Sequence, residues 1–152
     1  MPMQLRPRAE RGWVAETPEE EFVDAVNWFY DFLSDVINDI LIRKLDLLKL
    51  MVLKFDAVEK INKTYELGQD TRIAELKKDL SAILYRYRQI IDRLYLMAYN
   101  YNRLSSRFKP LIMPVDIFIP ERDDWVEVSI EDLPSILSRS REKIKELERL
   151  LG

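Results

Sequence analysis

The residue types that most enzymes use for catalysis are scarce in this chain of 152 residues, which has no cysteine and no histidine. Without cysteine there is no thiol nucleophile, no disulfide and no zinc site built on thiolates. Without histidine the chain lacks the commonest general base and a frequent metal ligand, so a serine triad is excluded as well. Three glycines are too few for a phosphate-binding glycine loop.

Carboxylates are the remaining candidates for chemistry. Helical spacing places a polar row on one side of the segment after Pro18, formed by Asp24, Asn27, Asp31, Asp35 and Asn38. Such a row can bind Mg²⁺, but a solvated face or a docking face for a basic partner is the simpler interpretation. Asp123 and Asp124 are typical of a turn. We therefore predict no catalytic residue, no metal site, no cofactor and no small-molecule substrate, and expect that the chain is not an enzyme.

Arginine and tyrosine residues in the middle of the chain suggest a second kind of site. Between residues 85 and 107, polar and basic side chains recur at helical spacing, and tyrosines lie near them in sequence. Arginines grip phosphates and tyrosines stack on bases, so this region is a candidate contact for nucleic acid. The candidate residues are Arg86, Gln89, Arg93, Asn100, Arg103 and Arg107 with Tyr85, Tyr95 and Tyr99, together with Arg6, Arg8 and Arg11 near the N-terminus.

The charge balance offers a competing interpretation of the same arginines. Residues 12–42 contain eight carboxylates and no lysine or arginine, whereas residues 72–109 carry an excess of positive charge. If the two segments fold against each other, they neutralise one another within the chain. The chain as a whole is acidic, with an isoelectric point near 5.2, whereas dedicated nucleic-acid-binding proteins are usually basic.

The elements that position these residues follow from the distribution of helix breakers. No proline occurs between Pro18 and Pro110, and Gly68 is the one glycine in that interval. The interval permits helices much longer than average, and Gly68 predicts a reversal at a left-handed position that ends the first helix. We predict an all-α fold, a long antiparallel helical hairpin resembling a coiled coil, with three regions: a flexible basic arm (1–16), the helical hairpin (17–109) and a C-terminal region (110–152).

Hydrophobic spacing sets the expected buried faces of the two long helices. Thr17 and Pro18 form a helix start, and the first apolar row is Phe22, Val26, Phe29, Leu33, Val36 and Ile40. A second row in a shifted frame, Leu41, Leu45, Leu48, Val52 and Phe55, predicts a stutter near Ile37 and Leu41 or a break within 34–38. From Asp70 or Thr71, a three–four pattern continues from Ile73 to Phe108 and predicts a helix that Pro110 ends.

The C-terminal region has a different pattern. Val115–Ile119 alternates like a strand, residues 121–124 form a turn, and Trp125–Val128 is a second short strand, so we predict a small β-hairpin. A final helix begins after Ser129 or Asp132, with a stripe of Leu133, Leu137, Ser140, Ile144, Leu147 and Leu151 facing the core.

Two helices cannot cover all of this apolar surface, because residues 41–55 are apolar around most of the helix circumference. We expect a helical scaffold or assembly subunit that pairs with itself or with another protein; a self-contained helical monomer is the alternative. The expected contacts are Leu47, Leu50, Met51 and Leu53, with Tyr85, Tyr95 and Tyr99 on the second helix. No apolar run is long enough to span a membrane and no secretory signal is recognisable, so we expect a cytoplasmic protein; the cysteine-free, Glu- and Arg-rich composition favours a heat-adapted source.

Overall fold

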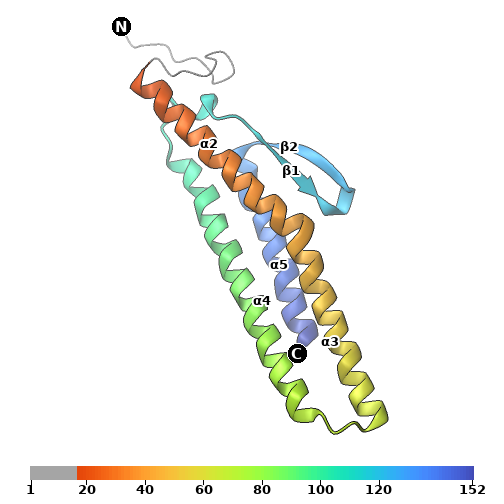
Figure 1. The fold of residues 1–152 in the computed structure, drawn as a ribbon. Coiled ribbons are helices and arrows are strands. Elements are labelled where there is room, and N and C mark those ends of the chain that lie inside the picture. The colour runs from red at the N-terminus through yellow and green to blue at the C-terminus, as the bar shows by residue number, and fades with distance from the viewer. Residues whose placement is uncertain (1–16) are drawn as a thin grey trace.

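The computed structural model describes residues 17–152, which form a mostly helical fold with one small antiparallel sheet (Figure 1). The predicted arm, residues 1–16 with Arg6, Arg8 and Arg11, lies outside the described residues. Helix α2 (Pro18–Asp39), a π-helical turn (Ile40–Lys44) and helix α3 (Leu45–Tyr65) follow one another without a loop. Helix α4 (Asp70–Tyr99), strands β1 (Val115–Ile119) and β2 (Asp124–Val128), and helix α5 (Leu133–Leu151) complete the fold.

Helix α2 begins where its capping residues predict. The Oγ1 atom of Thr17 accepts a hydrogen bond of 3.2 Å from the backbone N–H of Glu20, and Pro18 takes the first helical position. The chain stays α-helical through residues 34–38, so the predicted break in this stretch is not found. The change of frame falls instead at the π-helical turn, which accommodates an extra residue in the helix.

The reversal between α3 and α4 is close to the predicted place, but Gly68 is not the residue that ends the helix. Glu66 is the C-cap and adopts the left-handed conformation with φ of 50°; Gly68 follows with φ of 68°. The turn is held by Asn62, which donates to Asp70 Oδ1 (2.7 Å) and accepts from the Gln69 N–H (2.9 Å). A buried side-chain amide therefore joins the two helix ends.

Helix α4 is shorter than its apolar pattern predicts. It ends at Tyr99, and a 3₁₀ turn (Asn100–Arg103) and irregular chain lead on to a second 3₁₀ turn (Lys109–Leu111). Here the chain must turn towards β1, and the hydroxyl of Tyr101 donates to the carbonyl of Lys109 at 3.3 Å. The prediction of a helix as far as Pro110 was therefore wrong, because tertiary contacts of this segment override its helical periodicity.

The predicted β-hairpin is confirmed. Strands β1 and β2 pair antiparallel, with Val115 opposite Val128 and Phe118 opposite Trp125. The rings of Phe118 and Trp125 contact each other at 5.7 Å between centroids, and Asp123 provides the left-handed residue of the turn. A two-stranded sheet needs support from elsewhere in the fold, which helix α2 supplies along β1.

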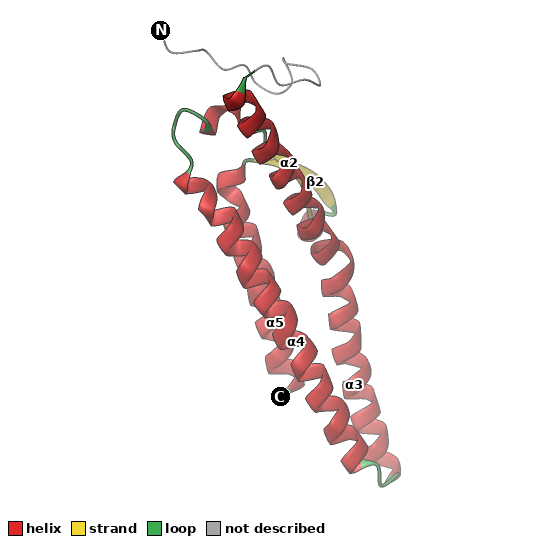
Figure 2. Cartoon of the chain, turned by 60° about the vertical axis from the view of Figure 1, so that its left-hand side comes forward, coloured by secondary structure: helices red, strands yellow, loops and turns green. Residues whose placement is uncertain are grey.

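Helix α5 lies between α3 and α4 and packs mainly along α4 (Figures 1 and 2). All six residues of its predicted stripe are buried, so this prediction is confirmed. The principal neighbour of α4 is therefore α5 rather than the first long helix. No helix within residues 17–152 has the length and apolar character needed to cross a membrane.

Candidate interaction surface

Helix α4 carries two apolar rows that differ in their surroundings. Leu84, Ile91 and Ala98, spaced seven residues apart, are buried. The residues immediately before them, Ile83, Ile90 and Met97, form a parallel row that is partly exposed: Ile91 is 0% exposed and Ile90 is 40% exposed. Because successive helical residues are 100° apart, α5 covers the first row and leaves the second uncovered.

The long helix opposite has a largely uncovered row of its own. In α2 the residues, again seven apart, are Phe22 and Phe29, which are exposed, and Val36, which is partly buried against the core. In α3 the row continues with Met51 and Val58, which are both exposed. Fifteen residues separate Val36 from Met51, one more than two steps of seven, and the π-helical turn between them accommodates the additional residue. Both halves of the row therefore lie on the same side of the molecule.

The two rows meet in a groove at the upper end of the helices in Figure 1. Leu104, seven residues beyond Met97, lines this groove together with Phe22 and Phe29. Tyr30 also lines it; burial, together with the neighbouring Tyr101, raises the pKa of Tyr30 to about 12. We call this surface the open face: Phe22, Phe29, Met51 and Val58 on α2–α3, and Ile83, Ile90 and Met97 on α4.

The predicted contact residues of α3 do not all share this surface. Leu47, Leu50, Met51 and Leu53 are all exposed, between 37% and 53%. Helical spacing places Leu47 beside Met51 on the side of the open face. Leu50 lies 100° around the helix from Met51, between Leu47 and Leu53, and Leu53 points towards the side opposite Met51. Two of the four predicted residues, Leu47 and Met51, are therefore brought together, and Leu50 and Leu53 are separated from Met51.

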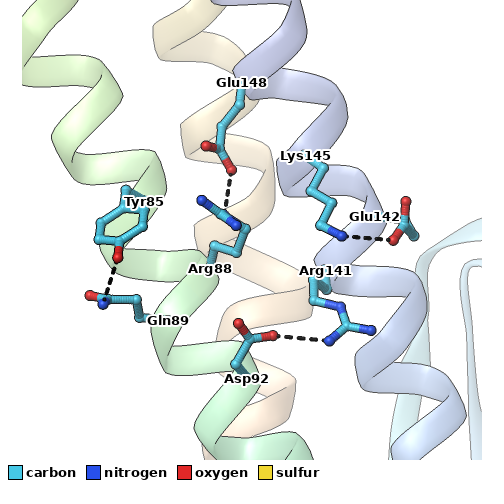
Figure 3. A network of polar contacts seen from close by, with 8 residues as sticks. All are labelled: Tyr85, Arg88, Gln89, Asp92, Arg141, Glu142, Lys145 and Glu148. Carbon is cyan, nitrogen blue, oxygen red and sulfur yellow. Dashed lines mark hydrogen bonds and ion pairs between the residues drawn. The ribbon is translucent and has the colours of Figure 1, made fainter.

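The predicted tyrosines of α4 do not lie on the open face. Tyr95 stacks on Tyr99 and packs under the guanidinium of Arg141 from α5, at 5.6 Å. Tyr85 lies on the side of α4 away from α5, and its hydroxyl accepts a hydrogen bond of 3.1 Å from Gln89 (Figure 3). Tyr95 and Tyr99 are therefore separated from the predicted nucleic-acid contacts, whereas Tyr85 contacts one of them, Gln89.

The candidate nucleic-acid contacts are likewise divided. Arg86 and Arg93 are exposed and border the open-face row of α4, roughly opposite Tyr95 around the helix. Arg103 ends the 3₁₀ turn after α4, and Arg107 lies in the irregular chain, with its guanidinium 5.5 Å from the ring of Phe108. Because α4 ends at Tyr99, the predicted continuous face from Arg86 to Arg107 does not form.

Ion pairs on the other border of α4 lead to α5. Arg88 pairs with Glu148 at 2.9 Å, and Asp92 pairs with Arg141 at 3.2 Å (Figure 3). Lys145 and Glu142 form a further pair along α5. In the described part of the chain, the interhelical ion pairs of α4 thus join it to α5, whereas the sequence favoured neutralisation by the acidic segment of α2.

Two functional residues of the predicted acidic row have a different role. Asn27 and Asn38 are buried, and each binds an extended stretch of backbone. Asn27 donates to the Leu111 carbonyl (3.3 Å) and accepts from the Met113 N–H (2.8 Å). Asn38 donates to the Asp116 carbonyl (2.9 Å) and accepts from the Phe118 N–H (3.0 Å), as a third strand would.

The sequence interpretation of this row as solvated or docking was therefore wrong for Asn27 and Asn38. The available signal was their spacing of eleven residues, three helical turns, and the fact that they are amides among carboxylates. An amide both donates and accepts, as a pair of backbone groups requires, whereas a carboxylate only accepts.

Residues 17–152 contain no cluster of three or more side chains suited to hold a metal ion. Comparisons of the chain with protein-family models, with curated proteins and with solved structures found no match.

Proposed function

We propose that this chain is a non-catalytic helical assembly subunit that binds another protein surface through the open face. The observation that carries the proposal is the pair of apolar rows with seven-residue spacing that lie on the same side of the molecule. They are Ile83, Ile90 and Met97 on α4, and Phe22, Phe29, Met51 and Val58 on α2–α3. Rows of this spacing are the pattern by which long helices pack against further helices.

Exposure of so many large apolar side chains is costly for a free subunit. Burying a fully exposed leucine, isoleucine or phenylalanine stabilises a protein by about 1.5–3 kcal/mol. Contiguous apolar surface of this kind on a folded chain marks an interaction site. Helices α2–α3 and α4, with α5 behind them, would supply two helices of a larger bundle, and the partner would supply the others.

Photo-crosslinking tests the proposal directly. A photo-reactive amino acid placed at Leu47, beside the open face, is compared with the same group at Lys60, which is also exposed on α3. We expect crosslinks from position 47 to a discrete protein, either in the purified chain or in an extract of the source cells, and few from position 60. Equal labelling at both positions, or no protein adduct in either sample, would contradict the proposal.

A nucleic-acid-binding accessory or coat-like subunit is the second candidate. It is favoured by Arg86 and Arg93, exposed side chains without a described carboxylate partner, next to an apolar row. The separation of Tyr95 and Tyr99 from these arginines weighs against it. Binding of labelled single-stranded and duplex DNA in a salt series tests it, because phosphate contacts require an affinity that falls with salt concentration.

A further inference from the structure

The open face has charged borders of opposite sign, and this suggests its partner. On α4, Arg86 and Arg93 lie beside the row of Ile83, Ile90 and Met97. On α2, Glu21 and Asp39 lie beside the row of Phe22, Phe29 and Val36, within a helix that has seven carboxylates and no basic residue. Along α2 and the C-terminal half of α4, the surface is therefore apolar at its centre, with carboxylates on one edge and arginines on the other. Nearer the start of α4, Asp79 lies on the same edge as Arg86, seven residues before it.

Resting on the proposed function, we infer that the partner at the open face is a second copy of this chain, related by a two-fold axis parallel to the helices. Such an axis places α2 of each copy against α4 of the other. The same contact is therefore formed twice, and together the two contacts cover the apolar rows of both copies. The core of the dimer is then four long helical segments, and each α5 and β-hairpin lies outside it.

The heights of the two helices make this orientation consistent with the charges. A two-fold axis along the helices leaves every residue at its own level, and the contact between the rings of Tyr30 and Tyr101 sets those levels. Asp39 lies nine residues beyond Tyr30, and Arg93 eight residues before Tyr101, so the two are at nearly the same height. In the dimer, Asp39 of each copy faces Arg93 of the other.

The competing two-fold axis, perpendicular to the helices, is disfavoured by the same charges. It would place the acidic α2 opposite the far end of the second copy, where α3 carries four lysines and three carboxylates and so has almost no net positive charge. Within its own chain Asp39 has one described ion pair, with Arg43 at 3.9 Å; the Arg43 side chain is largely exposed and the Asp39 side chain is about half exposed. Such a pair is weak and leaves the carboxylate available to a partner.

Cysteine crosslinking tests the arrangement, since the chain has no cysteine of its own. Chains carrying Val36→Cys are mixed with differently tagged chains carrying Met97→Cys and treated with a short bis-maleimide. The matched control replaces Met97→Cys by Tyr99→Cys, at a similar height on α4 but on the side of α5. We expect the yield of crosslinked mixed dimer to be at least fivefold higher with Met97→Cys than with Tyr99→Cys. Two chains that both carry Val36→Cys should give little crosslinked dimer.

A charge exchange provides an independent measurement on variants that keep the apolar rows intact. Arg93→Asp or Asp39→Lys alone places like charges opposite each other and should weaken dimerisation about tenfold by sedimentation equilibrium, and the two changes in one chain should restore it. Efficient linkage of Val36→Cys to itself, or absence of rescue, would overturn the two-fold arrangement. A chain that stays monomeric at micromolar concentration would overturn the second copy as partner, and a crosslink from position 47 to a different protein would then leave the proposed function standing.

Discussion

The two apolar rows of α4 are a comparison built into one helix. One row consists of Leu84, Ile91 and Ala98, and the other of the apolar residues directly before them, Ile83, Ile90 and Met97. The first row is buried under α5, whereas the second is partly exposed. The local sequence makes no distinction between them, since both are apolar and both repeat every seven residues. Burial is decided by which neighbouring helix reaches each side, and no helix of the described residues covers the second row; the proposed partner would do so.

The largest expected effect separates these rows directly. Ile91→Ala should lower the free energy of unfolding by about 2–5 kcal/mol, because it leaves a cavity against α5. Ile90→Ala removes the same atoms from a side chain that is 40% exposed, and should cost at most about 1 kcal/mol in the monomer. Urea unfolding of the two variants, measured under conditions where the chain is monomeric, checks the difference. Equal losses would show that the open face is already covered within one chain.

The next effect concerns the covered side of α2, where buried amides lie among apolar residues. Asn38→Ala removes both hydrogen bonds to β1 and should destabilise the fold by about 1–3 kcal/mol. Asp35→Ala, in the same helix but exposed, is the matched control and should change stability by less than about 0.5 kcal/mol. Hydrogen exchange at the Phe118 amide would locate the change: protection should fall in Asn38→Ala alone. Unchanged exchange at this amide would show that Asn38 does not hold the hairpin.

The smallest effect compares the charged borders of the two rows. Arg88→Gln breaks the ion pair with Glu148 beside the buried row, and should reduce the stability of the monomer by up to about 1 kcal/mol. Arg86→Gln, beside the exposed row, should leave the monomer unchanged and weaken only its association. Thermal unfolding together with sedimentation equilibrium separates the two readouts. A stability loss in Arg86→Gln as large as in Arg88→Gln would place Arg86 in an intrachain contact.

The reliability of the sequence patterns differed between helices for a physical reason. In α5 the polar and apolar sides are clearly divided, and every stripe residue from Leu133 to Leu151 is buried as predicted. In α2 the predicted row is only partly correct. Leu33 and Ile40 are buried as predicted, but Phe22 and Phe29 are exposed. Apolar residues lie on adjacent sides of α2, and its covered side includes amides that bind the hairpin segment, so hydrophobicity alone does not select the buried side.

The candidate surface was predictable in kind and only partly in place. The excess of apolar residues in 41–55 predicted exposed apolar side chains on α3, and Leu47 and Met51 are exposed and lie together. The separation of Tyr95 from Arg93 follows from helical spacing, because residues two apart lie on opposite sides of a helix. The packing of Tyr95 against Arg141 was not predictable, because α5 lies some fifty residues later in the chain.

By itself the sequence determined the local properties of this protein: helix starts, the reversal near Gly68, the β-hairpin, and the lack of the residue types that most catalysis requires. These depend on neighbours within a few residues, through backbone conformation, capping and alternation. Tertiary structure alone decided which apolar row is covered, where α4 stops and which asparagines are buried, because each depends on contacts between segments far apart in the chain. The free energy of those contacts is gained only when α5 and the hairpin are in place, and it is larger than the local preferences that it overrides.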